Sequence, residues 1–313
     1  MSDENNIIIS KGLSKKYNEH LVVDNLNLAI EKGEIFGLLG PNGAGKSTFI
    51  LMATGLTEPS SGSINVAGFN STRQPLEVKR ITGYLPEKIG FYNDMTARGN
   101  LAYTAELNNI PYREISKKID EVLEIVTMTK KKNQLVKTFS KGMKQRLGIA
   151  DVLIKDPRLV IFDEPTEGLD LKVANQILQT ILDLNKQKNI TFLLSSHQLN
   201  LMQKICSRVG ILSKGKLISE GTVENLGRKL FGGGKYRIEL ELEKVTDTLI
   251  EKLKKLDKVL NVNKVGNQLQ VICDKDIRQD ISRLIATEDI LITRMDMKQD
   301  ALEEIYLKYF KEE

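Results

Sequence analysis

The sequence predicts an α/β fold, with a mostly parallel sheet flanked by helices and a small α+β domain at the C-terminal end. Uninterrupted apolar runs at residues 159–162 and 192–194 are typical of parallel strands that are buried on both faces. From about residue 96 to 153 the strand signals vanish and apolar residues recur at helical spacing. Beyond residue 235 the pattern reads β-α-β-β-α-β, which predicts a separate small domain.

The length and charge of the chain restrict its class. Its 313 residues suit about two domains of ~150 residues each. We expect them at 1–230, with a helical subdomain at about 90–155, and at 235–313. The net charge of +5 is mild and not gathered into one tract, so no nucleic-acid partner is expected. An acidic, polar start excludes a secretory signal, and no apolar run approaches the ~20 residues of a membrane span. The two cysteines lack metal-ligand spacing, which favours a reducing cytosol.

The first two strands are expected at Ile7–Leu13 and Leu21–Ile30, and apolar and polar residues alternate at the end of the second. Tyr17 lies between them, ahead of the glycine-rich loop. A tyrosine there could stack on a nucleotide base, although a single tyrosine in a turn more often only packs.

A glycine-rich loop then joins a short buried strand, Glu34–Leu39, to a helix that begins at Lys46. Residues 40–47 match the phosphate-binding pattern G-x-x-x-x-G-K-[ST]. Its glycines can take positive φ, so that backbone N–H groups surround an anion at the start of the helix. Lys46 would reach the outer phosphates, and the Ser47 hydroxyl would hold Mg²⁺. The loop residues expected to bind a nucleoside triphosphate are Gly40, Pro41, Asn42, Gly43, Ala44, Gly45, Lys46, Ser47 and Thr48.

Acidic and histidine side chains follow the later strands. Asp163 and Glu164 come directly after the apolar run at 159–162, and His197 follows the strand Thr191–Ser196. Ligands of parallel sheets bind beyond the carboxyl ends of the strands, which is where these residues would lie. A lone histidine at a strand end is more often structural, unless a γ-phosphate lies beside it. An amphipathic helix over 171–186 separates the two strands, and a hairpin at 209–218 closes the sheet.

Ser140 has the character of an N-cap for a helix that runs towards Ile154. A plain helix cap is an equally simple interpretation of this residue.

In the last part of the chain, a hinge is expected at residues 231–235 by its Gly composition. Strands and helices then alternate up to a final helix at 301–310, and the order predicts a ferredoxin-like split βαβ domain. No catalytic constellation is visible in it. Regulation, dimer support and partner docking remain open as its role.

Residues 5–227 resemble the ATP-binding cassette (ABC) ATPase family, with the motifs in the order of that family. The loop at 40–48 resembles Walker A, and 159–164 resembles Walker B. The run 139–145 resembles the signature loop, 85–87 the Q-loop and 167–170 the D-loop. The resemblance implies a P-loop NTPase cassette with an antiparallel β-subdomain and a helical insertion. The C-terminal extension makes the chain most similar to drug- and antibiotic-exporting ATPase subunits.

The resemblance also implies roles for individual residues. Mg²⁺ would be held by Ser47, Asp163 and Glu87, while Glu164 would polarise the attacking water. Lys46 and His197 would contact the phosphates, and Tyr17 would stack on adenine. Ser140, Lys141 and Gly142 would face the ATP of a second subunit. Glu87 stands where the family usually has Gln, and Lys141 and Met143 replace a Gly and a Gln of the commonest signature.

The partners implied are ATP, a head-to-tail second copy or paired cassette subunit, and integral membrane permease subunits. The chain is accordingly expected on the cytoplasmic face of the membrane, as a peripheral subunit that powers transport, in the direction of export. One alternative is a soluble cassette ATPase that acts on ribosomes or DNA. Such relatives usually carry two cassettes or a long coiled coil, whereas this sequence has one phosphate loop. A non-catalytic ATP-binding switch is disfavoured by the presence of Glu164 and His197.

Overall fold

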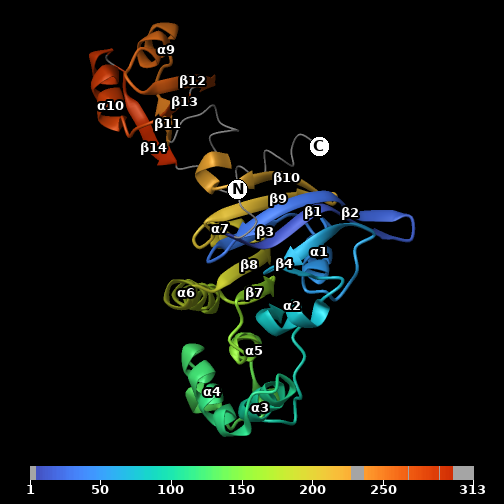
Figure 1. Ribbon diagram of the computed structural model, residues 1–313. Helices are drawn as coiled ribbons and strands as arrows, with labels where there is room; N and C mark the ends of the chain where they lie inside the picture. Colours follow the sequence, from blue (N-terminus) through green and yellow to red (C-terminus); the bar gives the residue numbers. More distant parts are fainter. Residues whose placement is uncertain (1–4, 227–235, 267, 289, 299–313) are drawn as a thin grey trace. The chain divides into compact units, whose positions relative to one another are not determined.

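The computed structural model describes residues 5–226, 236–266, 268–288 and 290–298 (Figure 1). The chain divides into two compact units, Met1–Ser219 and Glu220–Glu313, and each is described separately. The expected hinge at residues 231–235 lies outside the described residues, so a domain boundary there stays a prediction.

A six-stranded sheet in the order β10-β9-β3-β8-β7-β6 forms the centre of the first unit. The pairs β6·β7, β7·β8, β3·β8 and β3·β9 are all parallel. Every residue of β3, β7 and β8 is buried, which explains why their sequences are apolar runs without alternation. The strands are β3 (Ile35–Leu39), β6 (Thr82–Leu85), β7 (Leu159–Asp163), β8 (Thr191–Ser196), β9 (Arg208–Ser213) and β10 (Lys216–Gly221).

A second, antiparallel sheet has the order β2-β1-β4-β5. Its strands are β1 (Asn6–Tyr17), β2 (His20–Glu31), β4 (Ser61–Val66) and β5 (Phe69–Asn70). Helix α1 (Lys46–Ala53) contacts β2 and β4 on this sheet and β7 on the six-stranded sheet. One apolar core therefore joins both sheets and α1, with Phe36, Phe49 and Leu193 fully buried in it. This core fixes the start of α1 against the ends of the parallel strands.

Helices make up the rest of the first unit, and α3, α4 and α5 pack on one another as the expected helical subdomain. Side chains cap three helices: Thr96 caps α3, Ser140 caps α5 and Asp170 caps α6. Helix α2 was not expected, because its seven residues are too short to show a helical period. The helices are α2 (Pro75–Ile81), α3 (Ala97–Leu107), α4 (Tyr112–Ile125), α5 (Lys141–Leu153), α6 (Leu171–Lys188) and α7 (Leu199–Met202), with 3₁₀ turns at Thr129–Lys131 and Val136–Thr138.

The second unit contains an antiparallel sheet in the order β12-β13-β11-β14 and two helices. This order, with its βαββαβ connection, is the expected ferredoxin-like split βαβ arrangement. Its own core contains Ile238, Leu253 and Ile281. The predicted helix at 301–310 lies outside the described residues. The elements are β11 (Tyr236–Leu242), α9 (Asp247–Lys254), β12 (Val259–Val265), β13 (Gln268–Cys273), α10 (Arg278–Thr287) and β14 (Ile292–Lys298).

None of the helices in the described parts of the two units combines the length and the apolar character that a membrane span requires.

Candidate active site

The parallel register brings the predicted residues to one edge of the six-stranded sheet. Leu85 pairs with Phe162, Asp163 with Ser195, and Leu39 with Ser196, so four strands end at the same level. The segments that follow those strands therefore meet at this edge. They are the phosphate-binding loop after β3, Glu87 after β6, the acid pair at the end of β7 and His197 after β8.

The start of α1 has the backbone geometry of an anion site. Gly45 is its N-cap with φ 102°, and no side chain caps the helix. Helical geometry leaves the N–H groups of Lys46, Ser47 and Thr48 without acceptors inside the helix. A Cβ on Gly45 would lie 2.7 Å from the Val22 carbonyl oxygen, whereas one on Gly43 would meet no described atom within 4 Å. The free N–H groups and the helix dipole together favour a phosphate here.

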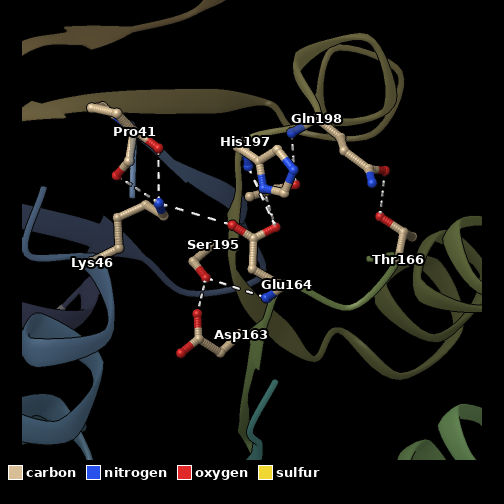
Figure 2. Close-up of polar contacts among 10 residues, drawn as sticks. Pro41, Lys46, Asp163, Glu164, Thr166, Ser195, His197 and Gln198 are labelled. Carbon is tan, nitrogen blue, oxygen red and sulfur yellow. Dashed lines mark hydrogen bonds and ion pairs between the residues drawn. The ribbon is translucent and has the colours of Figure 1, made fainter. Parts of the chain in front are cut away.

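Lys46 places a buried cation inside this loop. Its Nζ donates to the carbonyl oxygens of Gly40 at 2.8 Å and Pro41 at 3.1 Å, and it lies 3.9 Å from Glu164 Oε1 (Figure 2). Burial lowers the pKa of Lys46, and the carboxylates of Glu164, Asp163 and Glu167 oppose that shift. The ammonium is therefore held in place by the loop itself, facing the acidic edge of the sheet.

One carboxylate oxygen of Glu164 accepts no hydrogen bond from the described residues. Its Oε2 lies 3.0 Å from His197 Nδ1 and accepts a hydrogen bond of 3.4 Å from the His197 N–H. Its Oε1 is buried and has no hydrogen-bond partner among the described residues. The Glu164 side chain is 7% exposed, whereas that of His197 is 42% exposed. A buried carboxylate with a free oxygen can accept the proton of a bound water.

Asp163 is oriented by a residue that the sequence analysis did not single out. It is buried, and its Oδ1 accepts a hydrogen bond from the Ser195 hydroxyl (Figure 2). The same hydroxyl accepts a 3.3 Å hydrogen bond from the Glu164 N–H. Ser195 was overlooked because it was interpreted only as part of a buried strand. Aligning the predicted strands in parallel would have placed it beside the acid pair.

The donor atoms of this edge suit Mg²⁺ that arrives with a nucleotide. The Asp163 carboxylate lies at the edge, and Ser47 and Glu87 are exposed. Burial raises the pKa of Tyr84 to about 12, with contributions from Asp163 and then Glu87, so both carboxylates act on one side chain. The described residues include no cluster of three or more His, Cys, Asp or Glu able to hold a metal. Mg²⁺ commonly takes one or two protein carboxylates and fills its shell with phosphates and water, which fits this set.

The remaining predicted residues make local contacts of their own. Tyr17 is the last residue of β1 rather than part of a turn, and Lys15 Nζ lies 4.9 Å from its ring centroid. Ser140 caps α5 by accepting a hydrogen bond from the Met143 N–H at 3.3 Å. Lys141 packs against the backbone of Gly168, because a Cβ added at that glycine would lie 2.5 Å from Lys141 Nζ. No hydrogen bond found in the described chain joins Tyr17 or Ser140 to the Lys46 cluster.

Known proteins with similar sequences and folds are ATP-binding subunits of ABC transporters. A family model described as ABC transporter matches residues 23–167. The bacitracin transport ATP-binding protein BcrA of Bacillus licheniformis is 36% identical, over 96% of both chains. The linearmycin resistance ATP-binding protein LnrL of Bacillus subtilis is 35% identical, over 81% of this chain and 80% of its own length. A solved structure of an ATP-binding subunit of an ABC transporter superposes with a TM-score of 0.66 at 30% identity, covering 72% of this chain and 94% of its own.

Proposed function

The chain belongs to the ABC transporter family of ATP-binding proteins, and from this premise we propose that two copies, joined head to tail, power export through separate membrane-spanning subunits. As a member of that family, the chain binds and hydrolyses ATP with Mg²⁺. The observation that carries the proposal is the cluster of Lys46, Glu164 and His197 at one sheet edge, beside the open start of α1.

Binding rests on positioned positive charge. The N–H groups at the start of α1 and the Lys46 ammonium surround the β- and γ-phosphates. Ser47, Asp163 and Glu87 would hold Mg²⁺, which would supply positive charge against the phosphate oxygens. The loop carbonyls of Gly40 and Pro41 already hold the Lys46 ammonium in the absence of a nucleotide, which limits the reorganisation needed during the reaction.

Hydrolysis requires a base beside the γ-phosphate. Glu164 accepts a proton from water through its free Oε1, while the water oxygen bonds to the γ-phosphorus and the bond to the β-phosphate oxygen breaks. His197, half-exposed and 3.0 Å from Oε2, orients the carboxylate and contacts the γ-phosphate. A positioned base contributes roughly 10²–10⁴-fold in rate.

The second copy completes each site. Ser140 and Lys141 are exposed at the start of α5, where the helix dipole favours a phosphate. In a head-to-tail pair this end, with Lys141 and Gly142, contacts the ATP held by the other copy, and Tyr17 stacks on its adenine. Such closure follows ATP binding only if ATP binds the closed pair more tightly than the open one.

The direction of transport and the location are supported by the relatives. BcrA is named for bacitracin transport and LnrL for linearmycin resistance. Moving an antibiotic out of a cell is the simplest way for a transporter to give resistance. We therefore place the chain at the cytoplasmic face of the membrane, docked on permease subunits, with 235–313 as an accessory domain.

Replacing Glu164 with Gln tests this proposal. Glu164→Gln keeps the shape of the side chain but cannot take up a proton, so ATP turnover should fall by at least ~100-fold while ATP binding persists. With ATP and Mg²⁺, this variant should also shift from monomer to dimer in size-exclusion chromatography with light scattering. The exposed Glu121→Gln, on α4, serves as the matched control and should behave like the parent chain.

Near-normal turnover by Glu164→Gln would remove Glu164 from the role of base. A variant that stays monomeric with ATP at high concentration would contradict closure by two copies alone.

A further inference from the structure

Ser195 makes two hydrogen bonds at the centre of the site. It lies on β8 directly opposite Asp163 in the parallel register, and its side chain is fully buried. Its hydroxyl donates to Asp163 Oδ1 and accepts from the Glu164 N–H at 3.3 Å (Figure 2). One buried hydroxyl therefore contacts both acidic residues at the end of β7.

The first hydrogen bond restricts the Asp163 carboxylate. The Ser195 hydroxyl holds Oδ1 and so limits the rotation of the carboxylate (Figure 2). Partners of metal ligands orient those ligands, and their loss typically costs about 10–100-fold in metal affinity. Ser195 occupies that position relative to Asp163.

The second hydrogen bond holds the backbone of the adjacent residue. Glu164 has φ 52°, an uncommon conformation for a residue with a side chain. Its N–H donates to the Ser195 carbonyl oxygen at 3.1 Å as well as to the hydroxyl. Such a conformation persists only where the surrounding structure holds it. Ser195 thus also steadies the turn from which the Glu164 carboxylate projects.

We propose that Ser195 is a positioning residue for the ATPase reaction, whose hydroxyl orients Asp163 for the nucleotide-bound Mg²⁺ and steadies the turn at Glu164. This inference rests on the proposed function of the same site. It predicts that the hydroxyl, rather than the volume of the side chain, is what the site needs.

The neighbouring Ser196 provides a matched control. It is equally buried on the same strand, but its hydroxyl accepts a hydrogen bond of 3.0 Å from the Gln198 N–H. Successive side chains of a strand point to opposite faces of the sheet, so the hydroxyls of Ser195 and Ser196 have different hydrogen-bond partners.

The experiment measures metal binding directly, with Mn²⁺ as the probe in place of Mg²⁺. Free Mn²⁺ is followed by electron paramagnetic resonance during titration of the full chain with bound ATP. Ser195→Ala should weaken ATP-dependent Mn²⁺ binding by about 10-fold. Ser196→Ala should leave it unchanged. ATP affinity in the presence of EDTA should be the same in both variants, because no metal is then involved.

A second pair of variants separates the hydroxyl from packing. Thr and Val have nearly the same shape, so Ser195→Thr and Ser195→Val disturb the buried site equally. Ser195→Thr should retain Mn²⁺ affinity, whereas Ser195→Val should lose about as much as Ser195→Ala. The Mg²⁺ concentration that gives half-maximal hydrolysis should follow the same order.

Parent-like Mn²⁺ affinity in both Ser195→Ala and Ser195→Val would overturn the inference, as would an equal loss in Ser196→Ala. These outcomes are distinct from a failure of the proposed function, because that failure would appear as near-normal turnover or a persistent monomer in Glu164→Gln and would leave Mn²⁺ binding by the parent chain unchanged.

Discussion

At the scale of the residue, the site contains buried charged groups and an uncommon backbone conformation, both of which cost folding free energy. Lys46 is a cation with 6% exposure, and burial lowers its pKa. Glu164 combines a positive φ with a buried oxygen that lacks a partner among the described residues. Unsatisfied buried atoms and uncommon backbone conformations cluster at functional sites. Both features mark the same few residues here.

The phosphate-binding loop gives a prediction about stability. Gly45→Ala should destabilise the chain by about 1–3 kcal/mol, because φ 102° disfavours a side chain and the new Cβ would lie 2.7 Å from the Val22 carbonyl oxygen. Gly43→Ala is the matched control: its φ is 82°, but its Cβ has open space, so only the backbone penalty applies. Urea unfolding measures both. Equal unfolding midpoints for the two variants would contradict the close approach at Gly45.

At the scale of the element, caps and strand ends decide where the functional groups stand. In the described part of the first unit, three helices begin at side-chain caps, and three buried parallel strands end at one level. Ser140 and Thr96 make similar capping bonds, of 3.3 Å to the Met143 N–H and 3.0 Å to the Gly99 N–H. Of these two helix starts, that of α5 is assigned to a nucleotide in the proposed pair and that of α3 is not.

These two caps can therefore be separated by experiment. Ser140→Ala and Thr96→Ala should each cost about 1 kcal/mol in the free energy of unfolding, measured by urea denaturation. Only Ser140→Ala should also reduce steady-state ATP hydrolysis, because its helix start meets the ATP of the second copy. If hydrolysis falls equally in both variants, Ser140 acts as a plain helix cap.

Much of the element structure could be predicted from local pattern. The apolar runs predicted β7 and β8, and the loop pattern predicted the start of α1. Helix α2 was not predicted, because seven residues are too few to show a helical period. The hydrogen bonds of Ser195 and the backbone conformation of Glu164 were not predicted for another reason. They depend on the register between strands that are distant in sequence. Local pattern contains no information on that register.

At the scale of the whole molecule, every residue assigned to the nucleotide lies in the unit Met1–Ser219. The second unit has its own core and its own four-stranded sheet. The central claim, that this chain clamps a triphosphate at the start of α1, can therefore be tested on the first unit's residues in the intact chain.

The most direct test is a titration of the intact chain with ATP and Mg²⁺ by isothermal calorimetry, comparing the parent with Lys46→Ala and with the exposed Lys186→Ala. Losing a hydrogen-bonded charge costs about 1.5–3 kcal/mol, so Lys46→Ala should bind ATP roughly 10- to 100-fold more weakly. Lys186→Ala should bind as the parent does. Parent-like ATP affinity in Lys46→Ala would contradict the account.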